Sequence, residues 1–186
     1  STMVVKLSID GIAEKHDSLR GVNGSFIKAL DTYNALSPLL SKYPNFELGI
    51  NTVFCSENQD DMDGIIYFVK TLDKVKTHTI SLIRGDIKDP ALKDVDIEKY
   101  LHAARRLEGD VRCRTYRFRG AKIKAAQDVL QRKLIYSTVK ENRKMLSCLA
   151  GRLNLVVTES GDVYPCETFK EEFLMGNIRD FGCDLN

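Results

Sequence analysis

"VVKLSIDG" (residues 4–11) has the composition of a β-strand that closes in a turn at Asp10-Gly11. Beyond the turn, apolar side chains recur at near-helical spacing, at Phe26, Ala29, Leu30, Tyr33 and Leu40. The segment therefore predicts a strand followed by a helix.

The same order repeats further along the chain. "FELGINTVF" (46–54) has strand composition, and an amphipathic stripe follows it, formed by Met62, Ile65, Ile66 and Val69. "THTISLI" (77–83) predicts a third strand, and helices are expected from near residue 94 or 96 and over about 121–145. The order βαβαβαα implies parallel strands joined by right-handed crossovers, hence an open α/β sheet or part of a barrel, because three strands cannot close a barrel.

The last part of the chain departs from this alternation. "RLNLVVT" (152–158), a turn at 159–162 and "VYP" (163–165) predict a β-hairpin. We therefore expect two domains, an α/β part over 1–145 and a small hairpin module over 146–186.

Composition limits the class of protein. Of the residues, 43% are hydrophobic and 29% are charged, which is a globular balance. No run of about 18 apolar residues occurs and "STMVVKLSIDG" has no signal-peptide pattern, so a cytoplasmic protein with no membrane partner is expected.

The net charge of +2 gives no overall attraction to nucleic acid. The basic stretch at 105–124, with Tyr116 and Phe118, leaves RNA binding as a minor alternative to a solvated or docking face.

Polar residues are expected where the parallel strands end, because functional groups gather at that edge. Ser8 and Asp10 leave the first strand, Asn51 lies toward the end of the second, and Arg84 follows the third. This set suits a ligand with carboxylate and hydroxyl groups. In the alternative, Asp10 caps the turn with Gly11 and Arg84 is solvated.

Two familiar kinds of site are not indicated. "HDSLRGVNGS" (16–25) precedes a helix but contains no GxGxxG or GxxxxGK[ST] pattern, so a nucleotide-phosphate loop is not expected. His16, His78 and His102 have no metal-ligand spacing, and surface or packing roles are predicted for them.

Two cysteines flank the predicted hairpin. Twelve residues separate Cys148 from Gly161 and four separate Gly161 from Cys166, so the two thiols could approach one another and bind zinc or an iron–sulfur cluster. Such a centre needs more ligands, and Cys183 is the one later candidate. A purely structural hairpin is the alternative. Cys55 and Cys113 have no partner by spacing.

Three segments together resemble radical S-adenosylmethionine (radical SAM) enzymes that carry a SPASM or twitch extension. They are "KLSIDGIAEKHDSLRGVNGSF", "GINTVFCSENQDDM" and "CLAGRLNLVVTESGDVYPCETF…MGNIRD". The extension in that family opens with a cysteine, nine to fifteen residues, a glycine, four residues and a cysteine, and Cys148, Gly161 and Cys166 fit this pattern.

The resemblance implies a portion of a partial (β/α)₆ barrel, with about three parallel strands and their helices, and a C-terminal hairpin module. It places Ser8, Asp10, Arg20 and Asn51 beside S-adenosylmethionine, and makes Cys148 and Cys166 ligands of an auxiliary iron–sulfur cluster. It assigns no catalytic residue.

One motif of the family is absent from the 186 residues. The catalytic [4Fe-4S] cluster is held by CxxxCxxC, which does not occur here. We therefore expect a fragment, inactive alone, of an enzyme that cleaves S-adenosylmethionine reductively and abstracts a hydrogen atom from a substrate, with peptides and proteins as candidates. A non-catalytic metal- or ligand-binding interaction module is the alternative.

Three strands of a barrel should also affect association. They are expected to expose an apolar inner face and a strand edge. We therefore predict self-association or a need for the missing N-terminal barrel part.

Overall fold

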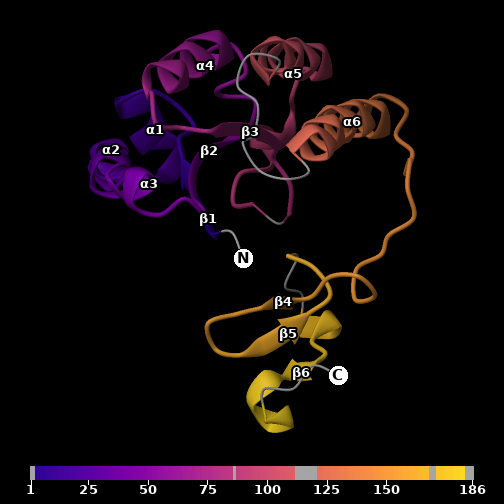
Figure 1. Ribbon diagram of the computed structural model, residues 1–186. Coiled ribbons are helices and arrows are strands. Elements are labelled where there is room, and N and C mark those ends of the chain that lie inside the picture. Colours follow the sequence, from indigo (N-terminus) through magenta and orange to yellow (C-terminus); the bar gives the residue numbers. More distant parts are fainter. Residues whose placement is uncertain (1–2, 86, 112–120, 168–170, 183–186) are drawn as a thin grey trace. The chain divides into compact units, whose positions relative to one another are not determined.

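A parallel three-stranded sheet is the framework of Ser1–Arg143, the first of two units into which the chain divides; the second is Lys144–Asn186. The computed structural model describes residues 3–85, 87–111, 121–167 and 171–182 (Figure 1).

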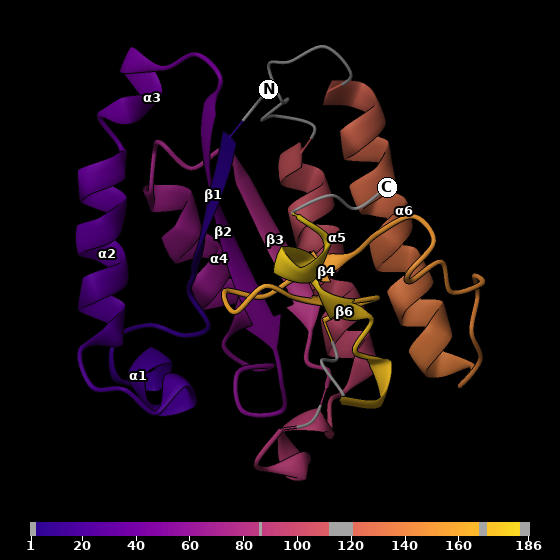
Figure 2. The ribbon, with the colours of Figure 1, turned by 90° about the horizontal axis from the view of Figure 1, so that it is seen from below.

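In the first unit, strands and helices alternate as predicted. The strands are β1 (Met3–Ser8), β2 (Phe46–Phe54) and β3 (Thr77–Leu82), paired in the order β1-β2-β3 (Figure 2). The helices are α1 (Glu14–Arg20), α2 (Ser25–Leu36), α3 (Leu39–Lys42), α4 (Met62–Thr71), α5 (Ile97–Val111) and α6 (Ala121–Lys140), with a 3₁₀ turn, η1, at Pro90–Lys93.

Alternation along the strands decides which face of the sheet is covered. Leu48 and Ile50 on β2 are fully buried and Ile80 on β3 is 3% exposed, so they form one apolar face. Helices α2, α4 and α5 pack on it with a shared core, to which the predicted stripe of α4 contributes Met62, Ile65, Ile66 and Val69. Each fully buried Leu or Ile there stabilises the fold by about 1.5–3 kcal/mol relative to exposure.

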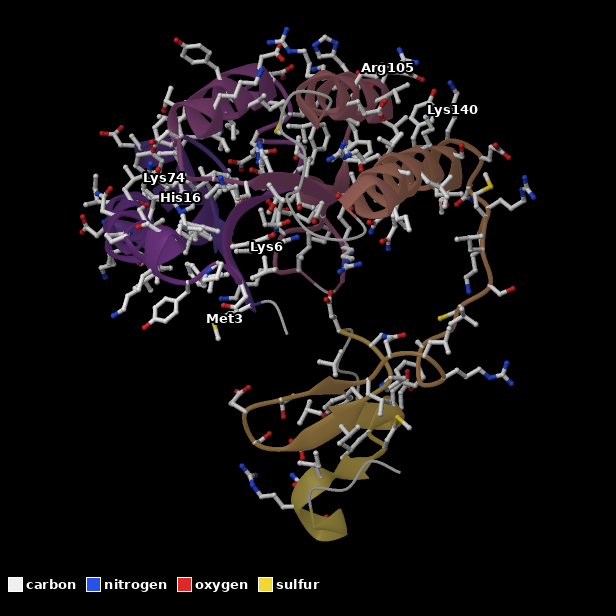
Figure 3. The ribbon with its side chains drawn as sticks, viewed as in Figure 1. Met3, Lys6, His16, Lys74, Arg105 and Lys140 are labelled. Carbon is white, nitrogen blue, oxygen red and sulfur yellow. The ribbon has the colours of Figure 1, made fainter. Side chains whose placement is uncertain are left out.

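The opposite face of the sheet is polar. The register sets Ser8 beside Asn51 and Asn51 beside Thr79, and Lys6 donates from Nζ to Thr79 Oγ1 across β2 at 3.0 Å. Figure 3 shows Lys6 on β1. The expectation of an apolar inner face is therefore wrong. The strand segments carry apolar residues at every other position, and the helices cover the face on which those residues lie.

Helices α6 and α1 differ from the sequence-based expectation. Helix α6 ends at Lys140, before the predicted residue 145, and Asn142 just beyond it adopts a left-handed φ of 45°. The short helix α1 was not predicted because it lacks a repeating apolar stripe. It stops at Gly21, with a φ of 64°.

The second unit contains the predicted hairpin. Strand β4 (Val156–Val157) pairs antiparallel with β5 (Asp162–Tyr164), and β5 pairs with β6 (Gly176–Asn177). Two 3₁₀ turns, η2 (Glu171–Phe173) and η3 (Ile178–Phe181), flank β6. Strand β6 was missed because two residues carry no periodic signal.

Two expectations concern partners. Residues 112–120 of the basic stretch lie outside the described residues, so nothing supports or opposes RNA contacts there. Among the described residues, no helix combines the length and apolar character needed to cross a bilayer.

Candidate functional site

Asp10 lies directly after β1 and is 6% exposed. Its Oδ1 accepts a hydrogen bond from the Val53 amide at 2.7 Å, and its Oδ2 forms an ion pair with Arg20 Nη2 at 2.6 Å. The carboxylate thus ties the end of β1 to β2 and to α1. The structure places Asp10 and Arg20 together and assigns the carboxylate a role other than a cap on Gly11.

The backbone of Asp10 is held as firmly as its carboxylate. Its N–H donates to His16 Nδ1 at 3.0 Å, and its carbonyl accepts from Asn58 Nδ2 at 2.8 Å. Asn58 is fully buried, donates also to the Val53 carbonyl and accepts from the Cys55 amide. These bonds fix the loop at the carboxyl edge of the sheet.

His16 has the packing role predicted for it. It is 2% exposed and its ring lies 5.8 Å from that of Phe26. Burial lowers the pKa of His16 against the opposing field of Asp10, so the imidazole is neutral. Because Nδ1 accepts from the Asp10 amide, the hydrogen bond assigns the proton to Nε2.

The N-terminus of α2 is occupied by a carboxylate of the chain itself. Asp17 accepts from the Gly24 amide at 2.6 Å and from the Phe26 amide and Ser25 hydroxyl at 2.8 Å each. The bond from Phe26, chiefly, holds the pKa of Asp17 below its usual value. An external phosphate has no place at this helix end, in agreement with the missing phosphate-loop motif.

Ser8 and Asn51 form a second pair at the same edge of the sheet. They are direct neighbours in the register of β1 and β2, and both are half-buried. Asn51 Oδ1 accepts from Ser81 Oγ at 3.0 Å, which brings β3 into the set. Ser81 was not predicted, although the polar alternation of "THTIS" carries the signal. The hydrogen bonds by which His16 and Asn58 hold Asp10 had no sequence signal.

These groups fit the polar ends of S-adenosylmethionine. The hydroxyl of Ser8 and the amide of Asn51 can donate to a carboxylate or accept from a hydroxyl or ammonium group. One carboxylate oxygen of Asp10 already contacts Val53 and the other contacts Arg20, and both oxygens keep further lone pairs that can accept hydrogen bonds. We call this edge of the sheet, with Ser8, Asp10, Arg20 and Asn51, the rim. The rim therefore offers short side chains that can donate or accept hydrogen bonds, beside the fixed ion pair of Asp10 and Arg20.

In the second unit, the segments next to Cys148 and Cys166 lie against each other. Asn154 forms a bridge with Ala150 and donates from Nδ2 to the Pro165 carbonyl at 3.2 Å. Ala150 follows Cys148 by two residues, and Pro165 precedes Cys166. Cys148 is exposed and Cys166 is half-buried.

The donor set is that of a thiolate-binding centre but is incomplete. Iron–sulfur clusters take thiolate ligands, usually four. The described residues contain no group of three or more His, Cys, Asp or Glu side chains placed to hold a metal. Cys183, the further candidate, lies outside the described residues. Two thiols on neighbouring segments fit part of a cluster site.

Gly161 sets the turn of the hairpin between the two cysteines. Its φ is 92°, and a Cβ there would lie 2.8 Å from Asn177 Oδ1. Asn177 Nδ2 donates to Asp162 Oδ1 at 2.9 Å, so β6 lies close against this turn.

Comparisons with known proteins give a family match for one part of the chain and a fold likeness for most of it. Residues 148–183 match the family model "SPASM: Iron-sulfur cluster-binding domain". No curated protein matches the chain.

Among solved structures, a histidine-tagged anSMEcpe with bound AdoMet matches 95% of this chain and 46% of its own, at 18% identity and a TM-score of 0.53. "Native anSMEcpe with bound AdoMet" matches 95% and 47%, at 18% identity and a TM-score of 0.51. The chain thus spans about half the length of these structures. They confirm the α/β fold class expected from the sequence.

Proposed function

We propose that this chain is a portion of a radical SAM enzyme. Residues 148–183 match the SPASM iron–sulfur family, and the fold is that of part of AdoMet-bound enzymes. The resemblance to radical SAM enzymes with a SPASM extension, drawn from the sequence, is confirmed. The observation that carries the proposal is that a cluster-binding extension follows a sheet whose carboxyl edge is polar, in one chain.

In this proposal the carboxyl edge of the sheet holds S-adenosylmethionine. Ser8 and Asn51 contact its polar groups, and Arg20, held by Asp10, directs donors toward the same edge. His16 and Asn58 keep the Asp10 loop in position. The chain's own residues thus bind and orient the cosubstrate. A bound [4Fe-4S] cluster supplies the electron for its reductive cleavage.

The complete enzyme needs a second set of ligands. CxxxCxxC does not occur in the sequence, so another polypeptide segment has to hold the catalytic cluster. We propose that the chain works as a fragment with such a segment, that its parent abstracts a hydrogen atom from a substrate, and that the substrate is a peptide or protein. The missing triplet also favours the alternative, a non-catalytic metal- or ligand-binding interaction module.

The first experiment tests the rim residues. Ser8→Ala and Asn51→Ala each remove a polar contact without touching the Asp10 network, and each is expected to weaken S-adenosylmethionine binding about tenfold in isothermal titration calorimetry. Ser41→Ala, an exposed serine on α3, is the matched control and should bind like the wild type. Equal affinities in all four proteins would contradict a binding role for this edge.

The second experiment tests the cysteines. After anaerobic incubation with iron and sulfide, native mass spectrometry should find less iron per chain in Cys148→Ser and Cys166→Ser than in the wild type. Cys55→Ser, which replaces a buried thiol of the first unit, should not differ from wild type. Iron retained in both variants would overturn the ligand assignment.

The same samples separate the enzyme from the module. With reductant and S-adenosylmethionine, the chain alone should form no 5′-deoxyadenosine. If the chain is an enzyme portion, an added polypeptide that carries CxxxCxxC should allow 5′-deoxyadenosine to form. A chain that binds iron but never supports cleavage favours the interaction module.

A further inference from the structure

Helices α5 and α6 each carry a buried polar side chain that has an unpaired atom. Tyr100 on α5 is fully buried, and Arg132 on α6 is 7% exposed. Within the described residues, Tyr100 Oη and Arg132 Nη1 are the buried side-chain polar atoms that have no hydrogen-bond partner. Buried polar groups are nearly always paired, so this pair calls for an explanation.

The two side chains lie on helices that pack against each other, α5 and α6. Tyr100 packs edge-on against Phe54, the last residue of β2, with ring centroids 5.5 Å apart. Arg132 lies one helical turn before Ile135, which packs against the core cluster that contains Tyr100. Burial raises the pKa of Tyr100 to about 12, against the opposing charge of Arg132. The phenol is therefore protonated at neutral pH and can donate.

Two carboxylates on the neighbouring helices are engaged elsewhere. Glu98 on α5 accepts from Tyr136 Oη at 2.7 Å and from Lys140 Nζ at 2.9 Å, and these bonds also hold α6 against α5 (Figure 3 labels Lys140). Asp63 on α4 pairs with Arg106 at 3.3 Å and with His102 at 3.5 Å. Neither acid compensates Arg132.

A buried guanidinium without a counter-charge is strongly unfavourable, and a ligand that supplies the charge would be bound in return. Two donors, one cationic and one phenolic, match an acceptor with a single negative charge and two oxygens. A phosphate dianion would leave a negative charge uncompensated beside a single cation.

We propose that Tyr100 and Arg132 form a carboxylate-binding site between α5 and α6. The site uses none of the residues of the rim proposed for S-adenosylmethionine, which are Ser8, Asp10, Arg20 and Asn51. The carboxylate belongs either to a small organic acid or to an aspartate or glutamate side chain of another polypeptide.

The test is thermal unfolding of the 186-residue chain in sodium acetate, against sodium chloride at equal ionic strength. Acetate should raise the unfolding midpoint saturably. In Arg132→Met the apparent affinity for acetate should fall about tenfold or more, and Tyr100→Phe should show a smaller loss. Arg105→Met, which replaces an exposed arginine of α5 (labelled in Figure 3), should respond like the wild type. Equal responses in wild type and Arg132→Met, or no response in wild type, would overturn the site.

A second measurement does not depend on the ligand. Without acetate, Arg132→Met should be at least as stable as the wild type, because it removes an unpaired buried charge. A clear loss of stability would show that the guanidinium is already compensated, and would overturn the proposal. A blocked Gly-Asp-Gly peptide, tested beside acetate, distinguishes the sources: stabilisation by both indicates a polypeptide side chain, and by acetate alone a small acid.

Discussion

At the scale of single residues, the carboxyl edge of the sheet depends on a few buried polar groups that satisfy one another. Asp10 uses its amide, carbonyl and both carboxylate oxygens, with His16, Asn58, Val53 and Arg20 as partners. A buried polar group left without its partner is destabilising, so each of these contacts supports the others. The rim residues Ser8 and Asn51 lie on β1 and β2, the two strands that the Asp10 contacts hold together.

His16 makes the stability of the first unit depend on pH. The folded protein lowers the pKa of this imidazole, chiefly through burial, while the unfolded chain has the ordinary value of about 6.5. Below that pH the imidazole of His16 is protonated in the unfolded chain but stays neutral in the folded protein, so protonation favours unfolding. The contribution of His16 is therefore fully present above about pH 6.5 and is lost as the pH falls toward the lower folded value.

Urea unfolding at a series of pH values between about 7.5 and 5 measures this effect. His16→Asn retains an acceptor near the Nδ1 position without a titrating group, so its midpoint should change less over this range than that of the wild type. His102→Gln replaces an exposed histidine and should follow the wild type. Asp17 and Asp162, whose pKa values are lowered, lose their contributions only below about pH 4, outside the window. Parallel curves for wild type and His16→Asn would contradict the assignment.

At the scale of elements, the hairpin of the second unit depends on one glycine. At Gly161 an alanine would meet two penalties, a φ of 92° and a Cβ 2.8 Å from Asn177 Oδ1. At Gly182, in the same unit, φ is 62° and no atom of the described residues lies within 4 Å of the added Cβ. Left-handed strain costs about 1 kcal/mol or more at either position, so the contact with Asn177 should distinguish them.

Gly161→Ala should therefore increase amide hydrogen exchange over β4, β5 and β6 more than Gly182→Ala does. Because the turn sets how the two arms meet, Gly161→Ala should also lower iron incorporation through Cys148 and Cys166. Equal exchange in the two variants would show that the contact with Asn177 does not constrain the turn.

At the scale of the whole molecule, the order of elements could be predicted from sequence and the tertiary contacts could not. Apolar periodicity predicted the stripe of α4 and the strands near 4–9, 46–54 and 77–83. Sequence spacing predicted that two cysteines flank the hairpin. Periodicity shows that a strand has two faces but not which neighbours meet them. The polar inner face, the Asp10 bonds to His16 and Asn58, and the two-residue strand β6 therefore came only from the structure.

The polar face changes the basis for the predicted self-association, which now depends on strand edges. In the described sheet β1 pairs with β2 alone and has one edge without a partner strand. Met3 and Val4 on β1 are 64% and 48% exposed, and an exposed apolar edge strand is a template for pairing with another chain. Val4 lies opposite Glu47, so Val4→Lys adds an edge charge and gains an oppositely charged cross-strand neighbour.

Sedimentation across a concentration series should therefore show association of the wild-type chain and less of it for Val4→Lys. Val22→Lys is the matched control: Val22 is 51% exposed, lies in the loop before α2 and should leave association unchanged. If both lysine variants reduce association equally, net charge is responsible and not the edge of β1. A wild type that stays monomeric at every concentration would contradict self-association. It would show that the polar face of the sheet, which carries Lys6, Ser8 and Asn51, tolerates water without a partner.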